Sequence, residues 1–158
     1  MSIIGIVAVA RNFAIGKNGK LPWHYAADLK FFKQTTTNHA VVMGFNTWKS
    51  IGKPLPNRLN IVLSRARNFE NQPNVLLMRD RAEVLALEKF LKCDLCIIGG
   101  ASVYQLFEND IERWLVTEIP EIVPDADTFL PADYLQNFVL NSTETLADDL
   151  RVKLYRRG

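Results

Sequence analysis

Hydrophobic residues fall in short runs along the chain, and each run has the length of a single strand. The first run, residues 2–10, is almost entirely apolar and rich in Ile and Val, which is typical of a strand covered on both faces. Later runs predict further strands at 40–43, 59–63, 75–78, 95–98 and 114–117. Helical spacing predicts helices at 26–36, 47–51, 81–91 and 102–107, with Asp80 as the N-cap of the third.

The order of these elements indicates the fold class. Strands and helices alternate through the first two-thirds of the chain, which predicts an α/β fold with a central, mostly parallel sheet and helices on both faces. After Pro120 the pattern changes to strands and turns, so residues 137–143 and 150–156 are expected to pair antiparallel at one edge. No repeat or linker interrupts the pattern, and we expect a single domain over residues 1–158.

Composition narrows the class of protein. Of the 158 residues, 48% are hydrophobic and 23% charged, which is ordinary for a soluble globular domain. A net charge of +2 is too small to indicate nucleic-acid binding, and no apolar run approaches the roughly 18–20 residues of a membrane span. The N-terminus lacks the basic region of a signal peptide, and two cysteines do not make a disulfide scaffold. We therefore expect a cytoplasmic protein.

Two segments are too rich in Gly, Asn and Pro to form regular elements. They are residues 14–23, AIGKNGKLPW, and residues 51–58, IGKPLPNR. Both also contain apolar residues, among them Leu21, Trp23 and Leu55, which argues against loops that are only solvated. Loops on a rigid scaffold are where binding residues concentrate, so both are candidate parts of a site.

Asp28 is the most informative single residue, because it lies four positions before Phe32 on the same face of the helix expected at 26–36. It has two interpretations. It is either a first-turn carboxylate that interacts with the helix dipole, or a carboxylate partly buried in an apolar cleft. Lys30 and Lys33 lie on other stripes of the helix, so a buried Asp28 would need another partner, such as a ligand with N–H donors.

Two strand ends are candidate phosphate sites. Gly99 and Gly100 join a strand to a helix, where glycine allows close backbone approach and helix amides favour phosphate. Residues 63–67 end another strand with Ser64, Arg65 and Arg67, a set suited to a phosphate monoester. Each is also compatible with an ordinary turn or a solvated strand end. Ligands of open α/β sheets gather at the carboxyl ends of strands, so two candidates of this kind support each other.

Cysteine and histidine chemistry has little support. Cys93 and Cys96 form a lone CxxC that runs into a strand, where such residues face opposite sides, so both are interpreted as structural. His24 and His39 form no metal-binding or hydrolase pattern, and we expect no metal.

Several motifs together resemble bacterial dihydrofolate reductases, in order and at the spacing of that family. They are Leu21-Pro22-Trp23 followed by Ala27-Asp28-Leu29 and Phe32; Val42-Met43-Gly44 followed by Thr47-Trp48 and Ser50-Ile51-Gly52; Pro54-Leu55-Pro56 followed by Arg58; Ile98-Gly99-Gly100; and Asp127-Thr128. The resemblance spans the chain from Ile6 to the C-terminal strands.

The resemblance implies hydride transfer from NADPH to the pteridine ring of dihydrofolate, giving tetrahydrofolate for one-carbon metabolism. It implies that Asp28 bonds the amino and N–H groups of the pteridine and promotes its protonation. Thr117 would join the same network, and Trp23 would hold an ordered water near it. Residues 14–23 would form a mobile lid over the nicotinamide, with Leu21 at its tip, and exclude water from the reaction.

The resemblance also implies binding residues. Those implied to surround the substrate are Ile6, Val7, Asp28, Leu29, Phe32, Lys33, Ile51, Lys53, Leu55, Arg58, Ile98 and Thr117. Arg58 among them would grip the glutamate carboxylate, because a guanidinium matches its fork geometry. Those implied to hold NADPH are Ala8, Ile15, Gly16, Lys17, Asn18, Gly19, Lys20, Leu21, Gly44, Phe45, Asn46, Thr47, Leu63, Ser64, Arg65, Arg79, Ile98, Gly99, Gly100, Ala101, Ser102, Val103, Tyr104 and Gln105. Antifolate inhibitors are a further expected ligand, and the protein is expected to be a monomer that binds neither nucleic acid nor membrane.

Two positions depart from the family pattern. Phe45 and Ser102 stand where relatives often have basic residues that face the 2′-phosphate of the cofactor. Arg65 is expected to compensate, with Arg79 as a second possibility.

Three rival functions remain open from the sequence. A nucleotide-binding module without catalysis would have no reason for Asp28. A pyrimidine reductase of riboflavin synthesis would need neither the Trp23–Asp28–Phe32 pattern nor the clamp at Arg58. A thiol-redox function would depend on Cys93 and Cys96. Binding of a diaminopteridine separates the first two from the reductase interpretation.

Overall fold

The structure is a computed structural model that describes residues 1–66, 68 and 72–158. Two compact units make up the described chain. The first comprises Met1–Ile4 and Thr36–Ile111, and the second comprises Gly5–Thr35 and Glu112–Gly158. That the chain is a single domain stays a prediction.

Four strands form the sheet of the first unit, in the order β5-β4-β3-β6. They are β3 (Ala40–Gly44), β4 (Leu59–Leu63), β5 (Val75–Met78) and β6 (Leu95–Gly99), and neighbouring strands run parallel. Their positions confirm the strands predicted from the apolar runs. Val41, Ile61 and Ile97 are fully buried, as expected for a parallel strand with both faces covered.

Short helices follow these strands: α2 (Phe45–Ile51), α3 (Arg81–Leu85), η1 (Ala86–Lys89) and α4 (Ala101–Leu106). The predicted cap is confirmed, because the Asp80 carboxylate accepts a hydrogen bond from the amide of Glu83 at 2.9 Å. The helix predicted at 81–91 is shorter than expected and tightens into a 3₁₀ turn after Leu85. Val84 is buried in α3, whereas η1 has no buried residue, and a short helix without a packed face is marginal.

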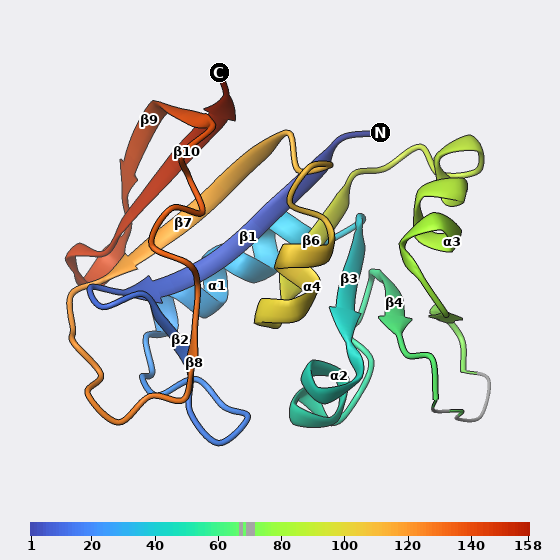
Figure 1. The fold of residues 1–158 in the computed structure, drawn as a ribbon, viewed down its shortest axis with the longest axis horizontal. Helices are drawn as coiled ribbons and strands as arrows, with labels where there is room; N and C mark the ends of the chain where they lie inside the picture. The colour runs from blue at the N-terminus through green and yellow to red at the C-terminus, as the bar shows by residue number, and fades with distance from the viewer. Residues whose placement is uncertain (67, 69–71) are drawn as a thin grey trace. The chain divides into compact units, whose positions relative to one another are not determined.

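The strands of the second unit follow the order β1-β7-β10-β9 (Figure 1). They are β1 (Ile3–Ala10), which begins in the first unit, β7 (Arg113–Ile119), β9 (Phe138–Thr145) and β10 (Arg151–Arg157). β10 pairs antiparallel with both β7 and β9, which confirms the predicted antiparallel edge. Gly5 allows the close packing of β7 on β1, since a Cβ there would lie 2.6 Å from the Trp114 ring.

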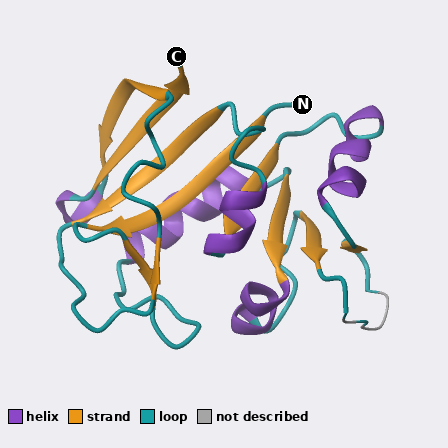
Figure 2. Ribbon diagram, in the orientation of Figure 1, coloured by secondary structure: helices purple, strands orange, loops and turns teal. Residues whose placement is uncertain are grey.

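A small second sheet corrects the prediction that residues 14–23 contain no regular element. Ala14–Gly16 forms β2, which pairs antiparallel with β8 (Thr128–Phe129). Sequence reasoning missed it because the partner strand lies more than a hundred residues away. The rest of the segment has no helix or regular strand, and it appears as loop in Figure 2.

Helix α1 (Ala26–Thr36) follows this loop with the bounds expected from the sequence. Nearby, Ala10, Ala14, Trp23, Ile119 and Leu150 form a buried cluster of the second unit. The observed elements agree with the predicted α/β class, a mostly parallel sheet with an antiparallel edge. In the described part of the chain, no helix is long and apolar enough to cross a membrane.

Candidate active site

A buried carboxylate lies in the first turn of α1. Asp28 is only 9% exposed, and the hydroxyl of Thr117, on β7, hydrogen-bonds to it. Burial raises the pKa of Asp28 above its ordinary value of 3.8, and the bond from Thr117 partly opposes this rise. Of the two interpretations from the sequence, the structure therefore supports a carboxylate inside an apolar environment.

Local structure fixes the positions of both groups. The amides of Asp28 and Leu29 donate to the carbonyl of Tyr25, which starts the helix. Thr117 lies at the middle of β7, opposite Val152 of β10. Among the described residues, no lysine or arginine forms an ion pair with Asp28. A buried charge without a cation is costly, so this site is suited to a ligand that brings its own donors.

Trp23 lies next to this carboxylate. Its indole Nε1 is buried and has no hydrogen-bond partner within the described chain. Trp23 and Asp28 both line a small cavity of about 30 Å³, together with Leu21, His24, Tyr25 and Leu29. A cavity of this size with polar groups in its wall can hold a water molecule.

Tyr25 is a residue near the site that sequence reasoning missed. Its hydroxyl donates to the Glu121 carboxylate at 2.5 Å, and this bond raises the pKa of Tyr25. The two residues are 96 positions apart, so no local pattern could have revealed the contact.

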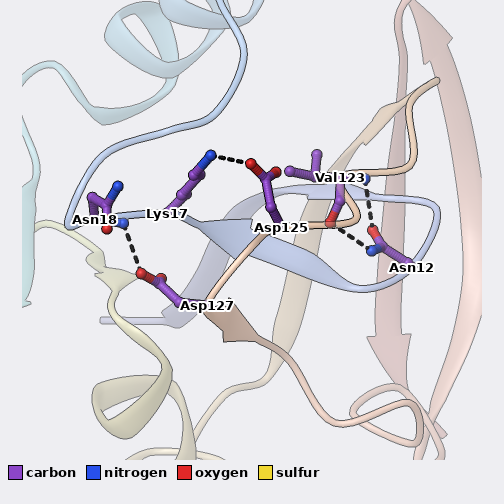
Figure 3. Close-up of polar contacts among 6 residues, drawn as sticks. All are labelled: Asn12, Lys17, Asn18, Val123, Asp125 and Asp127. Atoms are coloured by element: carbon purple, nitrogen blue, oxygen red, sulfur yellow. Dashed lines mark hydrogen bonds and ion pairs between the residues drawn. The ribbon is translucent and has the colours of Figure 1, made fainter.

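Polar contacts tie the candidate lid to residues 123–128 (Figure 3). Lys17 forms an ion pair with Asp125, and the amide of Asn18 donates to Asp127 at 2.8 Å. These contacts lower the pKa of both aspartates. Asn18 and Gly19 have positive φ in a tight turn between Lys17 and Lys20. Just before the lid, Asn12 exchanges two hydrogen bonds with the backbone of Val123.

Arg58 is the buried cation of the first unit. It is 6% exposed, and it donates from Nε to the Pro56 carbonyl at 2.8 Å and from Nη1 to the Thr36 hydroxyl at 3.0 Å. Burial lowers the pKa of Arg58. A guanidinium has five N–H donors, and in the described chain no acidic group pairs with this one. An anionic ligand would supply the missing charge.

The backbone at the end of β6 leaves room that a side chain would fill. Gly99 has a φ of +117°, and its peptide bond to Gly100 is cis. A Cβ on Gly99 would lie 3.4 Å from the Tyr104 ring, and one on Gly44 would lie 3.1 Å from Val103. The carbonyl of Gly100 accepts the first helical bonds of α4, from Val103 and Tyr104. Glycine at 99 and 100 keeps side-chain atoms off this turn, which suits a ligand that approaches the backbone closely, such as a cofactor pyrophosphate.

The end of β4 is held by Arg79, whose guanidinium donates to the Ser64 carbonyl at 2.9 Å and to Asn68 at 2.5 Å. Arg65 is exposed, which fits both a phosphate-binding group and a solvated strand end, and Arg67 lies outside the described residues. The ammonium of Lys49 lies 5.9 Å from the centre of the Phe45 ring. Lys49 was not predicted from the sequence, and it places a basic group beside Phe45, one of the two positions that depart from the family pattern.

Each unit contains only some of the residues predicted to bind substrate and NADPH. In the second unit, Leu21, Trp23, Asp28, Leu29 and Thr117 lie together, Ile6 and Val7 are buried in β1, Phe32 is half-buried and Lys33 is exposed. Ala8 packs against the cluster that contains Trp23. The first unit holds Ile51, Lys53, Leu55, Arg58, Ile98 and the remaining NADPH candidates, those from Gly44 onward.

Cys93 and Cys96 are half-buried and buried, and the described chain contains no disulfide between them. No group of three or more metal-ligating side chains lies among the described residues.

Comparison with known proteins identifies relatives. Residues 2–155 match the dihydrofolate reductase family. Dihydrofolate reductase of Buchnera aphidicola is 35% identical over 131 residues, covering 83% of this chain and 78% of that protein. The Haemophilus influenzae enzyme is 38% identical over 126 residues, covering 80% and 76%. A solved structure, dihydrofolate reductase from Enterococcus faecalis complexed with NADP(H) and RAB-propyl, is 30% identical with a TM-score of 0.89, covering 99% of this chain and 96% of that one.

Proposed function

The chain belongs to the dihydrofolate reductase family, and we propose that Asp28 is the group that binds and activates the pteridine of its substrate. The reaction is the NADPH-dependent reduction of dihydrofolate to tetrahydrofolate. NADPH supplies the hydride when it is bound, and the protein orients the reactants and manages the proton. The observation that carries the proposal is a buried carboxylate without a cationic partner.

Asp28 acts through hydrogen bonds and its raised pKa. The amino and N–H groups of the pteridine give the carboxylate the donors that the protein does not provide. A carboxyl whose pKa burial has raised above 3.8 is better suited to help deliver a proton than one with the ordinary pKa. Thr117 holds the carboxylate in place with its hydroxyl. The proton goes to the ring nitrogen next to the carbon that receives the hydride.

Trp23 and Leu21 complete the environment of this carboxylate. The buried indole N–H of Trp23 is suited to an ordered water in the cavity that Asp28 also lines. Leu21, 49% exposed at the end of the lid, would cover the reacting rings and exclude water. The contacts of Lys17 and Asn18 with Asp125 and Asp127 would hold the lid in a defined position.

Arg58 binds the opposite end of the substrate in this proposal. Its uncommitted N–H groups match the glutamate carboxylate, and burial would strengthen that pair. Ile51 and Leu55, half-buried on the same segment, would contact the benzoyl ring. Gly99 and Gly100 would admit the pyrophosphate of NADPH, with the Thr47 hydroxyl, 3.9 Å from the position of a Cβ on Gly100, as a nearby donor.

The direct test of Asp28 is NADPH oxidation followed by absorbance, with and without dihydrofolate, for wild type and Asp28→Asn. We expect turnover in wild type to require dihydrofolate, and Asp28→Asn to lose about 10²–10⁴-fold at neutral pH, the range of acid–base catalysis. Asp133→Asn removes an exposed carboxylate in the same unit and is the matched control. Equal turnover of both variants and wild type would disprove the role.

Because the chain belongs to the dihydrofolate reductase family, it is interpreted neither as a non-catalytic nucleotide-binding module nor as a pyrimidine reductase of riboflavin synthesis.

For the thiols, Cys93→Ser combined with Cys96→Ser is expected to retain activity. A diaminopteridine is expected to compete with dihydrofolate. The monomeric state is proposed from the sequence and is tested by the mass in solution.

Cofactor selectivity is proposed to rest on Arg65, because Phe45 and Ser102 carry no charge toward a 2′-phosphate. We expect Arg65→Ala to raise the KM for NADPH about tenfold, which is the effect of losing one charge-assisted hydrogen bond. The KM for NADH should be unchanged, because NADH has no 2′-phosphate. Lys49→Ala is the comparison, since Lys49 is the basic group beside Phe45. An unchanged KM for NADPH in Arg65→Ala would contradict the proposal.

A further inference from the structure

The turn at residues 55–58 has all of its backbone carbonyls bonded within the protein. The carbonyl of Pro56 accepts from Arg58 Nε, and that of Asn57 accepts from the amide of Asn38 at 2.8 Å. The carbonyls of Leu55 and Arg58 both accept from the side chain of one residue outside the turn, at 3.0 and 3.1 Å. That residue is Asn60, the second residue of β4.

The side chain of Asn60 uses both ends of its amide on this turn. Its Oδ1 accepts from the amide of Leu55 at 2.9 Å, while Nδ2 donates to the carbonyls of Leu55 and Arg58. A third carbonyl, that of Asn74, lies 3.4 Å from Nδ2. Asn60 is fully buried, at 0% exposure. Only a primary amide has two N–H donors and an acceptor in this geometry.

This turn also determines where the guanidinium of Arg58 lies. The Nε of Arg58 donates to the carbonyl of Pro56, two residues earlier, and the backbone carbonyl of Arg58 accepts from the Asn60 side chain. Without Asn60, the Arg58 carbonyl would be buried and the Leu55 carbonyl partly buried without a donor, and the turn would rearrange to reach water. A shift of the turn carries the Arg58 side chain with it, because Arg58 belongs to the turn and its Nε donates to the Pro56 carbonyl of the same turn.

We infer that Asn60 is a positioning residue for substrate binding: it fixes the turn at 55–58 so that Arg58 meets the carboxylate of the substrate's glutamate tail. This inference rests on the proposed role of Arg58. Asn60 touches no reacting group, so its removal should weaken binding of the tail and leave the chemistry at the pteridine unchanged.

The test compares two substrates, 7,8-dihydrofolate and 7,8-dihydro-6-methylpterin, which has no benzoylglutamate tail. Asn60→Asp keeps the size of the side chain but replaces its N–H donors with an oxygen facing carbonyls. For dihydrofolate we expect KM to rise at least about tenfold, the effect of losing one hydrogen bond to a charged group, with kcat changed less than about twofold. Kinetics with the methylpterin should be unchanged.

Further variants make the result specific. Asn12→Asp is the matched control, because Asn12 also exchanges hydrogen bonds with a loop backbone, that of Val123, and it should leave the ratio of the two substrates unchanged. In an Arg58→Ala background, Asn60→Asp should not raise the KM for dihydrofolate further. Asn60 acts through Arg58, so the effects of the two substitutions should not add. Asn60→Ser, which keeps one donor, replaces Asn60→Asp in every comparison if the latter does not fold.

Three outcomes would overturn the inference. Equal losses for both substrates in the Asn60 variants would show a general structural role. An unchanged dihydrofolate KM would show that the turn holds without this amide. If Arg58→Ala itself leaves the ratio of the two substrates unchanged while Asn60→Asp alters it, the proposed role of Arg58 is wrong, and the inference through Arg58 is wrong with it.

Discussion

Asp28 shows how a residue suited to function can be unfavourable for folding. Its carboxylate is buried on α1, its partner Thr117 offers one neutral hydroxyl, and burial raises its pKa. In the absence of a ligand, the ionised group is therefore less stable in the folded protein than in water. Binding of a pteridine with N–H donors would relieve this cost, which couples substrate affinity to the same burial.

Asp28→Asn should therefore increase stability at neutral pH while it lowers activity. Because its pKa is raised in the folded protein, Asp28 contributes stability when the pH is below its ordinary pKa of 3.8. This contribution is lost as the pH rises through the pKa of the folded state. The amide does not ionise, so Asp28→Asn is expected to have the higher Tm at pH 7, with the difference closing as the pH falls toward 3.8. Calorimetry across this range measures it, with Asp133→Asn as control. A lower Tm for Asp28→Asn at pH 7 would show that burying the ionised carboxylate does not destabilise the folded protein.

The sequence could predict Asp28 but not all of its surroundings. Helical spacing places Asp28 and Phe32 on one face of the helix, but this local pattern left a first-turn carboxylate that interacts with the helix dipole equally open. The bond from Thr117 joins residues on elements far apart in the chain, and its place came from the family resemblance. Tyr25–Glu121 and the amide of Asn60 carry no sequence signal, because their roles depend on backbone groups or distant side chains.

At the scale of elements, the lid at residues 14–23 is partly a strand and partly a tethered turn. β2 pairs with β8, and the amide of Asn18 is bonded to Asp127. The glycine-rich composition predicted irregular structure correctly for the second half of the segment and wrongly for its start. A three-residue strand has too little pattern to recognise, and it exists here only because a distant segment supplies its partner.

Asp127→Ala should loosen the turn of the lid. Asn18 loses its acceptor, and we expect its amide to exchange with solvent roughly several-fold faster, since local opening becomes easier. The pKa of Asp127 is lowered by this amide, so in wild type the protection of Asn18 should be lost as the pH falls through that lowered pKa. Hydrogen exchange followed by NMR measures both effects. Asp125→Ala, which breaks only the ion pair with Lys17, should leave the Asn18 amide protected, and equal acceleration in the two variants would argue against the assignment.

At the scale of the whole molecule, the alternation of apolar runs was sufficient to predict the α/β class and nearly every strand. The spatial order β5-β4-β3-β6 in the first unit was not predictable, because burial patterns indicate that a strand is covered but not which strands flank it. The antiparallel edge was predictable, since residues 137–143 and 150–156 are close in sequence and separated by turn residues.

The chain is expected to unfold as one domain. β1 begins in the first unit and continues in the second, so the two units share a strand through the chain itself. We predict a single transition in calorimetry, with equal calorimetric and van't Hoff enthalpies. Addition of a diaminopteridine and NADPH should move this one transition upward as a whole. Two transitions, of which only one responds to these ligands, would mean that the units fold independently.

The proton-delivery role of Asp28 is tested by the pH dependence of single-turnover hydride transfer from NADPH to dihydrofolate, in wild type and Asp28→Asn. In wild type the rate should rise as the pH falls and level off once the carboxyl, whose pKa burial has raised, is protonated. In Asp28→Asn the solvent must supply the proton, so the rate at neutral pH should be lower and should climb by about tenfold per pH unit without that plateau. Superimposable profiles would contradict the claim that Asp28 delivers the proton.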